Sequence, residues 1–258
     1  MCAAAACSRK MALSVRRAVL KALIFDVDGT LAETEELHRA SFNHVFEQFG
    51  LDWQWSHEAY GKLLTTTGGK ERIARFVQEL GLPPFEASRI AKMHAAKNAR
   101  YAEAVATGAL RLRPGIVPLI RDAIKHGLKL GIATTTSRSN LSALLENCLS
   151  KPERDHLTAI ICGEDVGRKK PDPEVYLLCL AKLNLGAAEA IAFEDSAVGL
   201  AAARTAQIAT IITPSAYTKG DDFSGALAVL PEVPDCLDRL DAVTAKNGGS
   251  LFHERQLQ

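Results

Sequence analysis

The sequence of 258 residues lacks a long apolar run and an excess of charge of either sign. No stretch approaches the roughly 18 apolar residues that a membrane-spanning helix needs, so we expect no membrane segment. Lysine and arginine total 31 against 30 acidic residues, which leaves no overall field to attract nucleic acid or an anionic membrane. We therefore expect no nucleic-acid or membrane partner, and any site for an anion must be local.

The cysteines show no Cys-x-x-Cys spacing. They lie far apart in the chain, and three fall within apolar segments typical of helices or strands. We interpret them as reduced thiols of an intracellular protein. The six are Cys2, Cys7, Cys148, Cys162, Cys179 and Cys236.

The N-terminal region lacks acidic residues. The first 25 residues contain five basic residues and an alanine run, a composition compatible with an organellar transit peptide. A tail, or an upstream start before Met11, would look similar. The apolar core of a secretory signal is missing. We treat residues 1–18 as an N-terminal extension and expect the protein in the cytoplasm or the chloroplast stroma.

The chain does contain an apolar run that ends in acids. The run at 20–25, interrupted by one lysine, precedes Asp26-Val27-Asp28-Gly29-Thr30. It predicts a strand buried on both faces, and the glycine permits a tight exit loop that exposes both carboxyl groups on the same side. Buried carboxylates need a cation or hydrogen bonds, so a bound metal ion is one interpretation. An ordinary Asp-rich turn is the other.

From residue 113 to residue 212, short apolar runs alternate with segments of helical periodicity. Strands that alternate with helices imply parallel right-handed crossovers, so the sequence predicts a three-layer α/β fold with a parallel sheet. The chain is long enough for one large domain or two small ones. The predicted strands are 20–25, 128–133, 159–162, 190–193 and 208–212, and the predicted helices are 114–126, 139–149, 173–183, 197–206 and 231–242.

Between the first strand and residue 113 the pattern is helical for about eighty residues, which indicates an insertion. An apolar stripe from Leu37 to Phe49 stops at Gly50, a residue typical of helix C-termini. We predict a helical cap over 35–111 and an α/β core over 19–34 and 112–245. The other helices expected in the cap are 56–64, 70–80 and 84–107.

Polar side chains follow three further predicted strands, and ligands on parallel sheets bind beyond the carboxyl ends of the strands. Thr134-Thr135-Thr136-Ser137 offers hydroxyl donors for a phosphate, although the last two suit a helix cap equally well. Lys169-Lys170-Pro171 can aim one lysine at the site and leave the other in solvent, unless both are surface charges. Glu194-Asp195 offers the oxygen ligands that Mg²⁺ prefers.

In this order, the four motifs resemble those of the haloacid dehalogenase-like phosphohydrolases, over residues 21–212. The motifs are Asp26-x-Asp28-Gly29-Thr30, Thr134 after an apolar strand, Lys170-Pro171-x-Pro173 and Glu194-Asp195-Ser196-x-x-Gly199. The resemblance implies a Rossmann-like three-layer core with an inserted α-helical cap domain. It also implies a phosphoric monoester hydrolase.

By that resemblance, the carboxyl groups divide the chemistry between them. Asp26 attacks phosphorus to form an aspartyl-phosphate, and Asp28 protonates the leaving oxygen and then activates water. Mg²⁺ is expected on Asp26, Asp195 and the carbonyl of Asp28, with Glu194 acting through water.

The same resemblance assigns the remaining core positions. Lys170 neutralises charge on the phosphoryl oxygens, and Thr134 with the amide of Thr135 completes the phosphate cradle. Which of Thr134, Thr135 and Thr136 binds the phosphate stays open at this point.

The cap matches one group of this family more closely. Residues 28–38 and 64–73, together with Arg113-Pro114-Gly115, closely resemble the CbbY-type sugar bisphosphatases. These act on xylulose-1,5-bisphosphate, a misfire product that inhibits Rubisco in the carbon-fixing Calvin cycle. The resemblance implies a small-molecule sugar phosphate or bisphosphate as substrate, and we expect a monomer.

A bisphosphate needs a second anion site, and the cap offers one. Gly68 and Gly69 precede a cationic helix start, so their amides, with Lys70 and Arg72, can hold a second phosphate. An ordinary solvated helix face would look alike. The other candidates in the cap are Glu35 and His38 for binding sugar hydroxyls, and His94 and Lys97 for facing the cleft.

Three other activities stay open from the sequence. A β-phosphoglucomutase-like phosphotransferase would use the same core and cap, and its cap would keep water off the aspartyl-phosphate. A phosphoglycolate-type phosphatase is disfavoured because that substrate is too short to use Lys70 and Arg72. A catalytically silent binding module is disfavoured by the presence of Asp26, Lys170 and Asp195.

Overall fold

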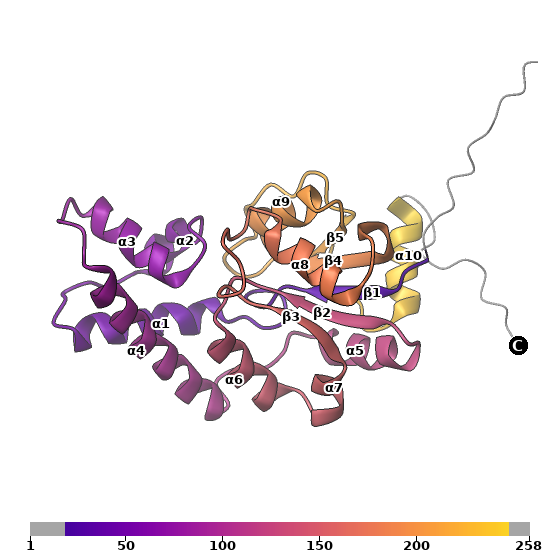
Figure 1. The fold of residues 1–258 in the computed structure, drawn as a ribbon, viewed down its shortest axis with the longest axis horizontal. Helices are drawn as coiled ribbons and strands as arrows, with labels where there is room; N and C mark the ends of the chain where they lie inside the picture. Colours follow the sequence, from indigo (N-terminus) through magenta and orange to yellow (C-terminus); the bar gives the residue numbers. More distant parts are fainter. Residues whose placement is uncertain (1–18, 248–258) are drawn as a thin grey trace, which may run out of the picture.

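The computed structural model describes residues 19–247, in which six parallel strands form one sheet (Figure 1). The strand order is β3-β2-β1-β4-β5-β6, so β1 lies at the centre with β2 and β4 paired on either side. Because all strands run the same way, their carboxyl ends open at one edge of the sheet. The strands are β1 (Ala22–Phe25), β2 (Lys129–Ala133), β3 (Leu157–Ile161), β4 (Ala190–Glu194), β5 (Ala209–Ile212) and β6 (Ala228–Val229).

Alternate residues of the strands pack against helices on opposite faces of the sheet. In β1, Leu23 and Phe25 join the apolar cluster of α5, α6 and α10, whereas Ala22 and Ile24 join that of α8 and α9. This two-sided burial explains the almost continuous apolar sequence of β1. The helices are α5 (Ile116–Lys125), α6 (Arg138–Cys148), α7 (Lys151–Asp155), α8 (Glu174–Leu183), α9 (Ala197–Thr205) and α10 (Leu237–Asn247), with a 3-10 turn η1 (Ala187–Glu189).

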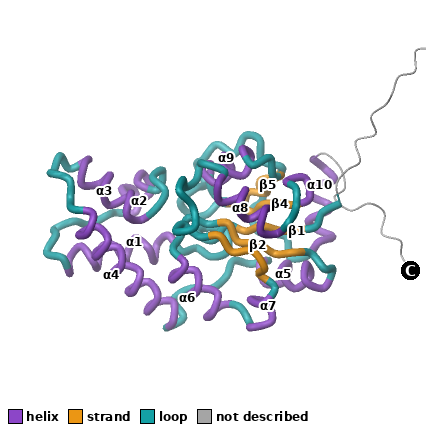
Figure 2. The backbone as a smooth tube through the Cα atoms, in the orientation of Figure 1, coloured by secondary structure: helices purple, strands orange, loops and turns teal. Residues whose placement is uncertain are grey.

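Four helices between β1 and α5 form a separate layer beside the carboxyl edge of the sheet (Figure 1). They have their own apolar cluster, centred on the aromatic rings of Phe42, Phe46, Trp55 and Tyr60. The loops that follow the strands gather between the sheet and these helices (Figure 2). The helices are α1 (Glu35–Gln48), α2 (His57–Leu63), α3 (Gly69–Glu79) and α4 (Ala87–Ala106).

The predicted α/β fold is confirmed, and the differences in detail have local causes. The helix predicted from residue 84 begins at Ala87, because the N-cap residue Glu86 has a non-helical ψ of 136°. The helix predicted at 231–242 begins only at Leu237 and continues to Asn247. The cap and core boundaries stay predictions, and the N-terminal extension lies outside the described residues.

Besides the 3-10 turn η1, two short elements were not predicted from the sequence. Helix α7 begins at a capping box, in which Ser150 and Glu153 satisfy each other's backbone amides, and this Ser-x-x-Glu signal was present in the sequence. Strand β6 spans two residues, too few for a periodic pattern. Neither element alters the edge of the sheet where the polar motifs gather.

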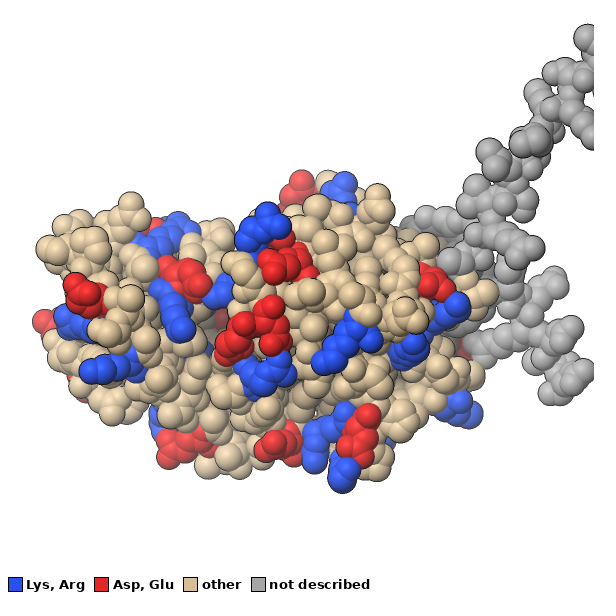
Figure 3. All heavy atoms as spheres, viewed as in Figure 1, with Lys and Arg blue, Asp and Glu red and all other residues tan. Residues whose placement is uncertain are grey.

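The distribution of charged side chains on the surface agrees with the nearly equal numbers of basic and acidic residues in the sequence. In the face that Figure 3 shows, Lys and Arg are interspersed with Asp and Glu rather than gathered in a patch of one sign. Within residues 19–247, no helix has the length and apolar character to cross a membrane. The four cysteines of this range, Cys148, Cys162, Cys179 and Cys236, are free thiols.

Candidate active site

Asp26 stands at the end of the central strand, where its backbone amide donates to the carbonyl of Phe193 on β4 at 3.0 Å. Lys170 Nζ donates to Asp26 Oδ1 at 2.6 Å, to Glu194 Oε1 at 2.6 Å and to the carbonyl of Ala133 at 2.9 Å. Burial alone would lower the pKa of Lys170, but the two carboxylates outweigh it and raise the pKa. The ammonium group is therefore fixed and charged at this edge of the sheet.

Three buried carboxyl groups meet beside this lysine. Asp26, Glu194 and Asp195 each offer an oxygen, and these oxygens lie within 4.8 Å of one another. Burial, followed by the neighbouring Glu194 carboxylate, raises the pKa of Asp195 to about 8. Burial also raises the pKa of Asp26 well above its usual value, while Lys170 opposes the shift. One lysine does not balance three carboxylates, so this oxygen cluster fits a hard divalent cation.

Two glycines make room for the cluster. At Gly199, in the first turns of α9, a Cβ atom would overlap the carboxyl group of Glu194. At Gly29, whose φ is +81°, a Cβ atom would overlap Oδ2 of Asp195. The glycines of the first and fourth motifs are thus explained by the close approach of carboxylates, which for Gly29 is the distant Asp195 and for Gly199 is Glu194 of the same motif.

Glu194 is oriented by a second donor. The hydroxyl of Tyr176, on α8, donates to Glu194 Oε1 at 2.5 Å, the same oxygen that accepts from Lys170. Oε2 is left for other contacts. Asp195 is held similarly, since Thr218 Oγ1 donates to its Oδ2 at 3.2 Å.

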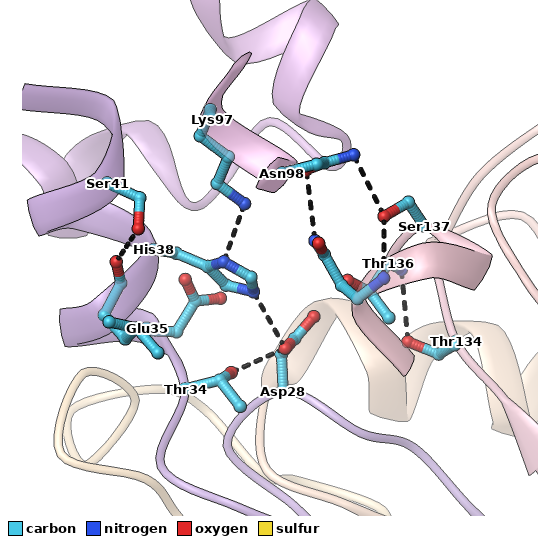
Figure 4. Close-up of polar contacts among 12 residues, drawn as sticks. Asp28, Thr34, Glu35, His38, Ser41, Lys97, Asn98, Thr134, Thr136 and Ser137 are labelled. Atoms are coloured by element: carbon cyan, nitrogen blue, oxygen red, sulfur yellow. Dashed lines mark hydrogen bonds and ion pairs between the residues drawn. The ribbon is translucent and has the colours of Figure 1, made fainter. Parts of the chain in front are cut away.

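Asp28 begins a chain of hydrogen bonds that crosses from core to cap (Figure 4). Its Oδ1 accepts from Thr34 Oγ1 at 2.5 Å and faces Nε2 of His38 at 3.1 Å. Lys97 Nζ lies 2.7 Å from Nδ1 of the same imidazole. The ammonium form of Lys97 can only donate, so with Lys97 protonated Nδ1 accepts and Nε2 carries the proton that points at Asp28.

The electrostatics of this chain favour an ionised Asp28. Burial would raise its pKa, but His38 and Thr34 outweigh burial and the pKa is lowered. Burial, and then the charge of Lys97, lowers the pKa of His38. A carboxylate oriented in this way can accept a proton from water. The structure joins His38 to Asp28 and also places it in the lining of the cavity, and the binding of a sugar hydroxyl by His38 stays a prediction.

In the threonine loop after β2, one hydroxyl bonds to the backbone of the loop. Thr134 is buried, and its Oγ1 accepts from the amide of Thr136 at 3.2 Å, so the hydroxyl closes the turn and does not line the cavity. Thr135, Thr136 and Ser137 do line it. Because Oγ1 only accepts in this contact, the hydroxyl keeps its own proton to donate, and a contact between Thr134 and the phosphate stays a prediction.

One cavity of about 300 Å³ joins the carboxylates of the core to the polar residues of the cap. Of the cap residues expected in the site, Glu35, Gly69, Lys70 and Arg72 all line it, as do His94 and Lys97. Lys70 is exposed. Arg72 is buried and donates from Nη1 to the hydroxyl of Tyr60 at 2.8 Å, and that hydroxyl donates to Glu35 Oε2 at 2.7 Å.

Arg72 carries an unusual feature for a buried side chain. Among the described residues, none accepts a hydrogen bond from its Nε. Arg72 lies in the first turn of α3, which begins at Gly69, and the N-cap residue Gly68 provides no side-chain cap for the first amides. A buried cation with a spare donor, next to uncapped amides, is suited to an anion.

The lysine expected in solvent is instead a contact between cap and core. Lys169 Nζ donates to Glu71 Oε1, on α3, at 2.5 Å. The neighbouring Thr67 Oγ1 donates to the carbonyl of Lys170 at 2.6 Å. The start of α3 is thus bound to the loop that carries Lys170, and both ends of the cavity are fixed relative to each other.

Comparison with known proteins agrees with this geometry. The family model described as haloacid dehalogenase-like hydrolase matches residues 23–213. CbbY of Rhodobacter capsulatus is 53% identical over 214 residues, which cover 83% of this chain and 94% of that protein.

Two solved structures of CbbY from Rhodobacter sphaeroides are also similar. One holds phosphate and is 46% identical, and the other, an Asp-to-Asn variant, holds xylulose-1,5-bisphosphate and is 45% identical. Each has a TM-score of 0.78 and covers 83% of this chain and 94% of that one.

Proposed function

Since this chain belongs to the haloacid dehalogenase-like hydrolase family, we propose that it is a Mg²⁺-dependent sugar-bisphosphate phosphatase that converts xylulose-1,5-bisphosphate to xylulose-5-phosphate. The chain is a phosphoric monoester hydrolase of CbbY type. The choice of substrate is supported by the bisphosphate in the similar CbbY structure and by the two charged ends of the cavity.

Asp26, Glu194 and Asp195 would hold the Mg²⁺ ion, with the carbonyl of Asp28 as a further predicted ligand. The ion supplies Lewis acidity, which neutralises charge on the phosphoryl oxygens. Lys170 supplies the same kind of stabilisation from the protein itself, since its ammonium group is held beside Asp26 by three hydrogen bonds.

In the first step, a carboxylate oxygen of Asp26 bonds to phosphorus as the bond from phosphorus to the sugar oxygen breaks. The leaving oxygen takes a proton from Asp28, so this step requires Asp28 to be protonated in the substrate complex, although His38 and Thr34 lower its pKa in the free protein. In the second step, Asp28 accepts a proton from water as the water oxygen bonds to phosphorus. The bond between phosphorus and the Asp26 oxygen breaks, which frees the Asp26 carboxylate and yields inorganic phosphate. His38 and Lys97 keep Asp28 oriented in both steps.

The distal phosphate would lie at the start of α3. Lys70 and Arg72 supply positive charge there, and the first amides of the helix supply donors. The observation that carries the proposal is Arg72, a residue that lines the same cavity as the carboxylates and whose buried Nε has no acceptor among the described residues. A phosphate oxygen would provide that acceptor.

A phosphate-release assay across sugar monophosphates and bisphosphates tests this function. With Mg²⁺ we expect the highest kcat/KM for xylulose-1,5-bisphosphate, and loss of turnover when a chelator removes the metal. Formation of glucose-6-phosphate from β-glucose-1-phosphate at a higher kcat/KM would favour the phosphotransferase instead. A higher kcat/KM for phosphoglycolate would show that a sugar bisphosphate is not the preferred substrate.

Removal of a Rubisco inhibitor is the physiological role that follows from this substrate. The proposed compartment is the cytoplasm or the chloroplast stroma. Imaging of a fusion that retains residues 1–18 tests it, with a second fusion that starts at residue 19 as control. Loss of plastid import in the shorter fusion alone would assign targeting to the extension.

A further inference from the structure

His94 lies on α4, one helical turn before Lys97, and lines the cavity. Its ring rests against the start of α3, because a Cβ atom at Gly69 would lie 2.6 Å from both Cδ2 and Nε2 of His94. Helix α3 packs against α4 along this contact. The imidazole therefore borders the place where Lys70 and Arg72 face the cavity.

The ring is a neutral donor among cations. Burial, and then the charges of Lys97, Lys70 and Lys169, lowers the pKa of His94 to about 3, and Glu71 opposes the shift. A neutral imidazole has one N–H donor and one acceptor nitrogen. Within residues 19–247, no hydrogen bond or ion pair engages either nitrogen of His94.

The neighbourhood is suited to an anion rather than to a neutral group. Lys70, Lys97 and Lys169 act on the ring with positive charge, and Gly68 gives the first amides of α3 no side-chain cap. The opposing charge comes from Glu71, which is paired with Lys169 and accepts from its own amide. A donor without added charge strengthens the recognition of a phosphate oxygen and adds no repulsion to the three lysines.

We propose that His94 is a specificity-determining residue that donates a hydrogen bond to the distal phosphate of a bisphosphate substrate. This role rests on the proposed function, since it needs a substrate that extends from Asp26 to the start of α3. It accounts for the small residue at position 69, where any larger side chain would displace the imidazole ring.

The test compares xylulose-1,5-bisphosphate with xylulose-1-phosphate, which lacks the distal phosphate. In His94→Leu, which removes the donor, we expect KM for the bisphosphate to rise by about tenfold or more, the loss typical of a hydrogen bond to a charged group. We expect KM for the monophosphate and both kcat values to stay within about twofold. His94→Gln retains an N–H at a similar reach and should restore most of the loss.

Two further measurements separate recognition from folding. The dissociation constant of xylulose-1,5-bisphosphate, measured by calorimetry in an Asp26→Asn background, should rise by a similar factor when His94→Leu is added. His126→Leu, at the exposed end of α5, is the matched control, and it should leave KM for both substrates unchanged. Gly69→Ala should reproduce the His94→Leu pattern, because the added methyl group displaces the ring.

The outcomes distinguish the two proposals. If the wild-type enzyme prefers the bisphosphate and His94→Leu raises KM for both substrates equally, or for neither, the role of His94 is refuted and the proposed function stands. If the wild-type enzyme shows no preference for the bisphosphate, the proposed function fails and the role of His94 fails with it.

Discussion

Lys97 Nζ lies 2.7 Å from His38 Nδ1, with both side chains buried between the cap and the core. The ammonium group also lies over the rings of Phe42 and Tyr101, at 5.0 Å and 5.3 Å from their centroids. A lysine on α4 thus sets the tautomer of a histidine on α1, and the histidine orients Asp28 in the core. The proton-transfer group depends on a residue of the cap.

Burial of Lys97 predicts a pH-dependent stability. Burial lowers its pKa from 10.5 to about 7. Between these values the unfolded chain binds more protons at this residue than the folded protein does, so the free energy of unfolding rises with pH across this window. We expect the stability of the wild type relative to Lys97→Met, measured by urea unfolding, to increase from pH 7 to pH 10.

Lys92→Met is the control for this experiment, because Lys92 is an exposed lysine on the same helix. The free energy of unfolding of Lys92→Met should change with pH as that of the wild type does. A difference between the wild type and Lys97→Met that did not change with pH would show that Lys97 has an ordinary pKa.

Asp26→Asn removes the proposed nucleophile and keeps the size of the side chain. We expect kcat to fall by about 1,000-fold or more, since the amide of asparagine is too poor a nucleophile to form the covalent intermediate. Circular dichroism and the unfolding midpoint should show an intact fold. Turnover near the wild-type rate would assign the nucleophile to another residue.

Gly199→Ala tests whether the glycine is needed for the carboxylate cluster. The added methyl group would overlap Glu194, although the backbone at this position suits alanine. We expect the dissociation constant of Mg²⁺ to rise by about tenfold or more, as for other residues that orient metal ligands. Gly167→Ala is the matched control, because its Cβ atom would make only ordinary contacts. Equal Mg²⁺ affinities of the wild type and Gly199→Ala would show that the carboxylate cluster does not need a glycine at position 199.

Lys70 and Arg72 are predicted to bind the distal phosphate, so their removal should act on the bisphosphate alone. In Lys70→Ala and Arg72→Ala, KM for xylulose-1,5-bisphosphate should rise by about tenfold or more. The larger effect is expected for Arg72, which is buried and also bonds Tyr60. Steady-state kinetics on a monophosphate provide the comparison, and equal losses on both substrates would remove these residues from the distal site.

Short-range patterns predicted the core of the site. Asp26 follows β1, Glu194 and Asp195 lie at the end of β4, and Lys170 lies in the loop after β3. A parallel sheet brings such positions to one edge. The same reasoning could not place Thr134, because the direction of a hydroxyl in a turn depends on which amide it meets.

Contacts between the cap and the core could not be predicted from local sequence patterns. Lys169 and Glu71 are 98 positions apart in the chain, and each alone is typical of a solvated charge. A partial signal existed on α4, where His94, Lys97 and Tyr101 follow a spacing of three and four residues and so share one face of an alanine-rich helix. Only the packing of α4 on α1 shows that this face meets His38.

The central claim is that Asp26 carries the phosphoryl group between substrate and water, and acid-quenched mass spectrometry tests it most directly. Enzyme mixed with xylulose-1,5-bisphosphate and Mg²⁺ and quenched within the first turnover should yield a peptide that contains Asp26 and one added phosphoryl group. The same peptide from Asp26→Asn should carry none. Rapid release of phosphate without any phosphorylated peptide would contradict the account.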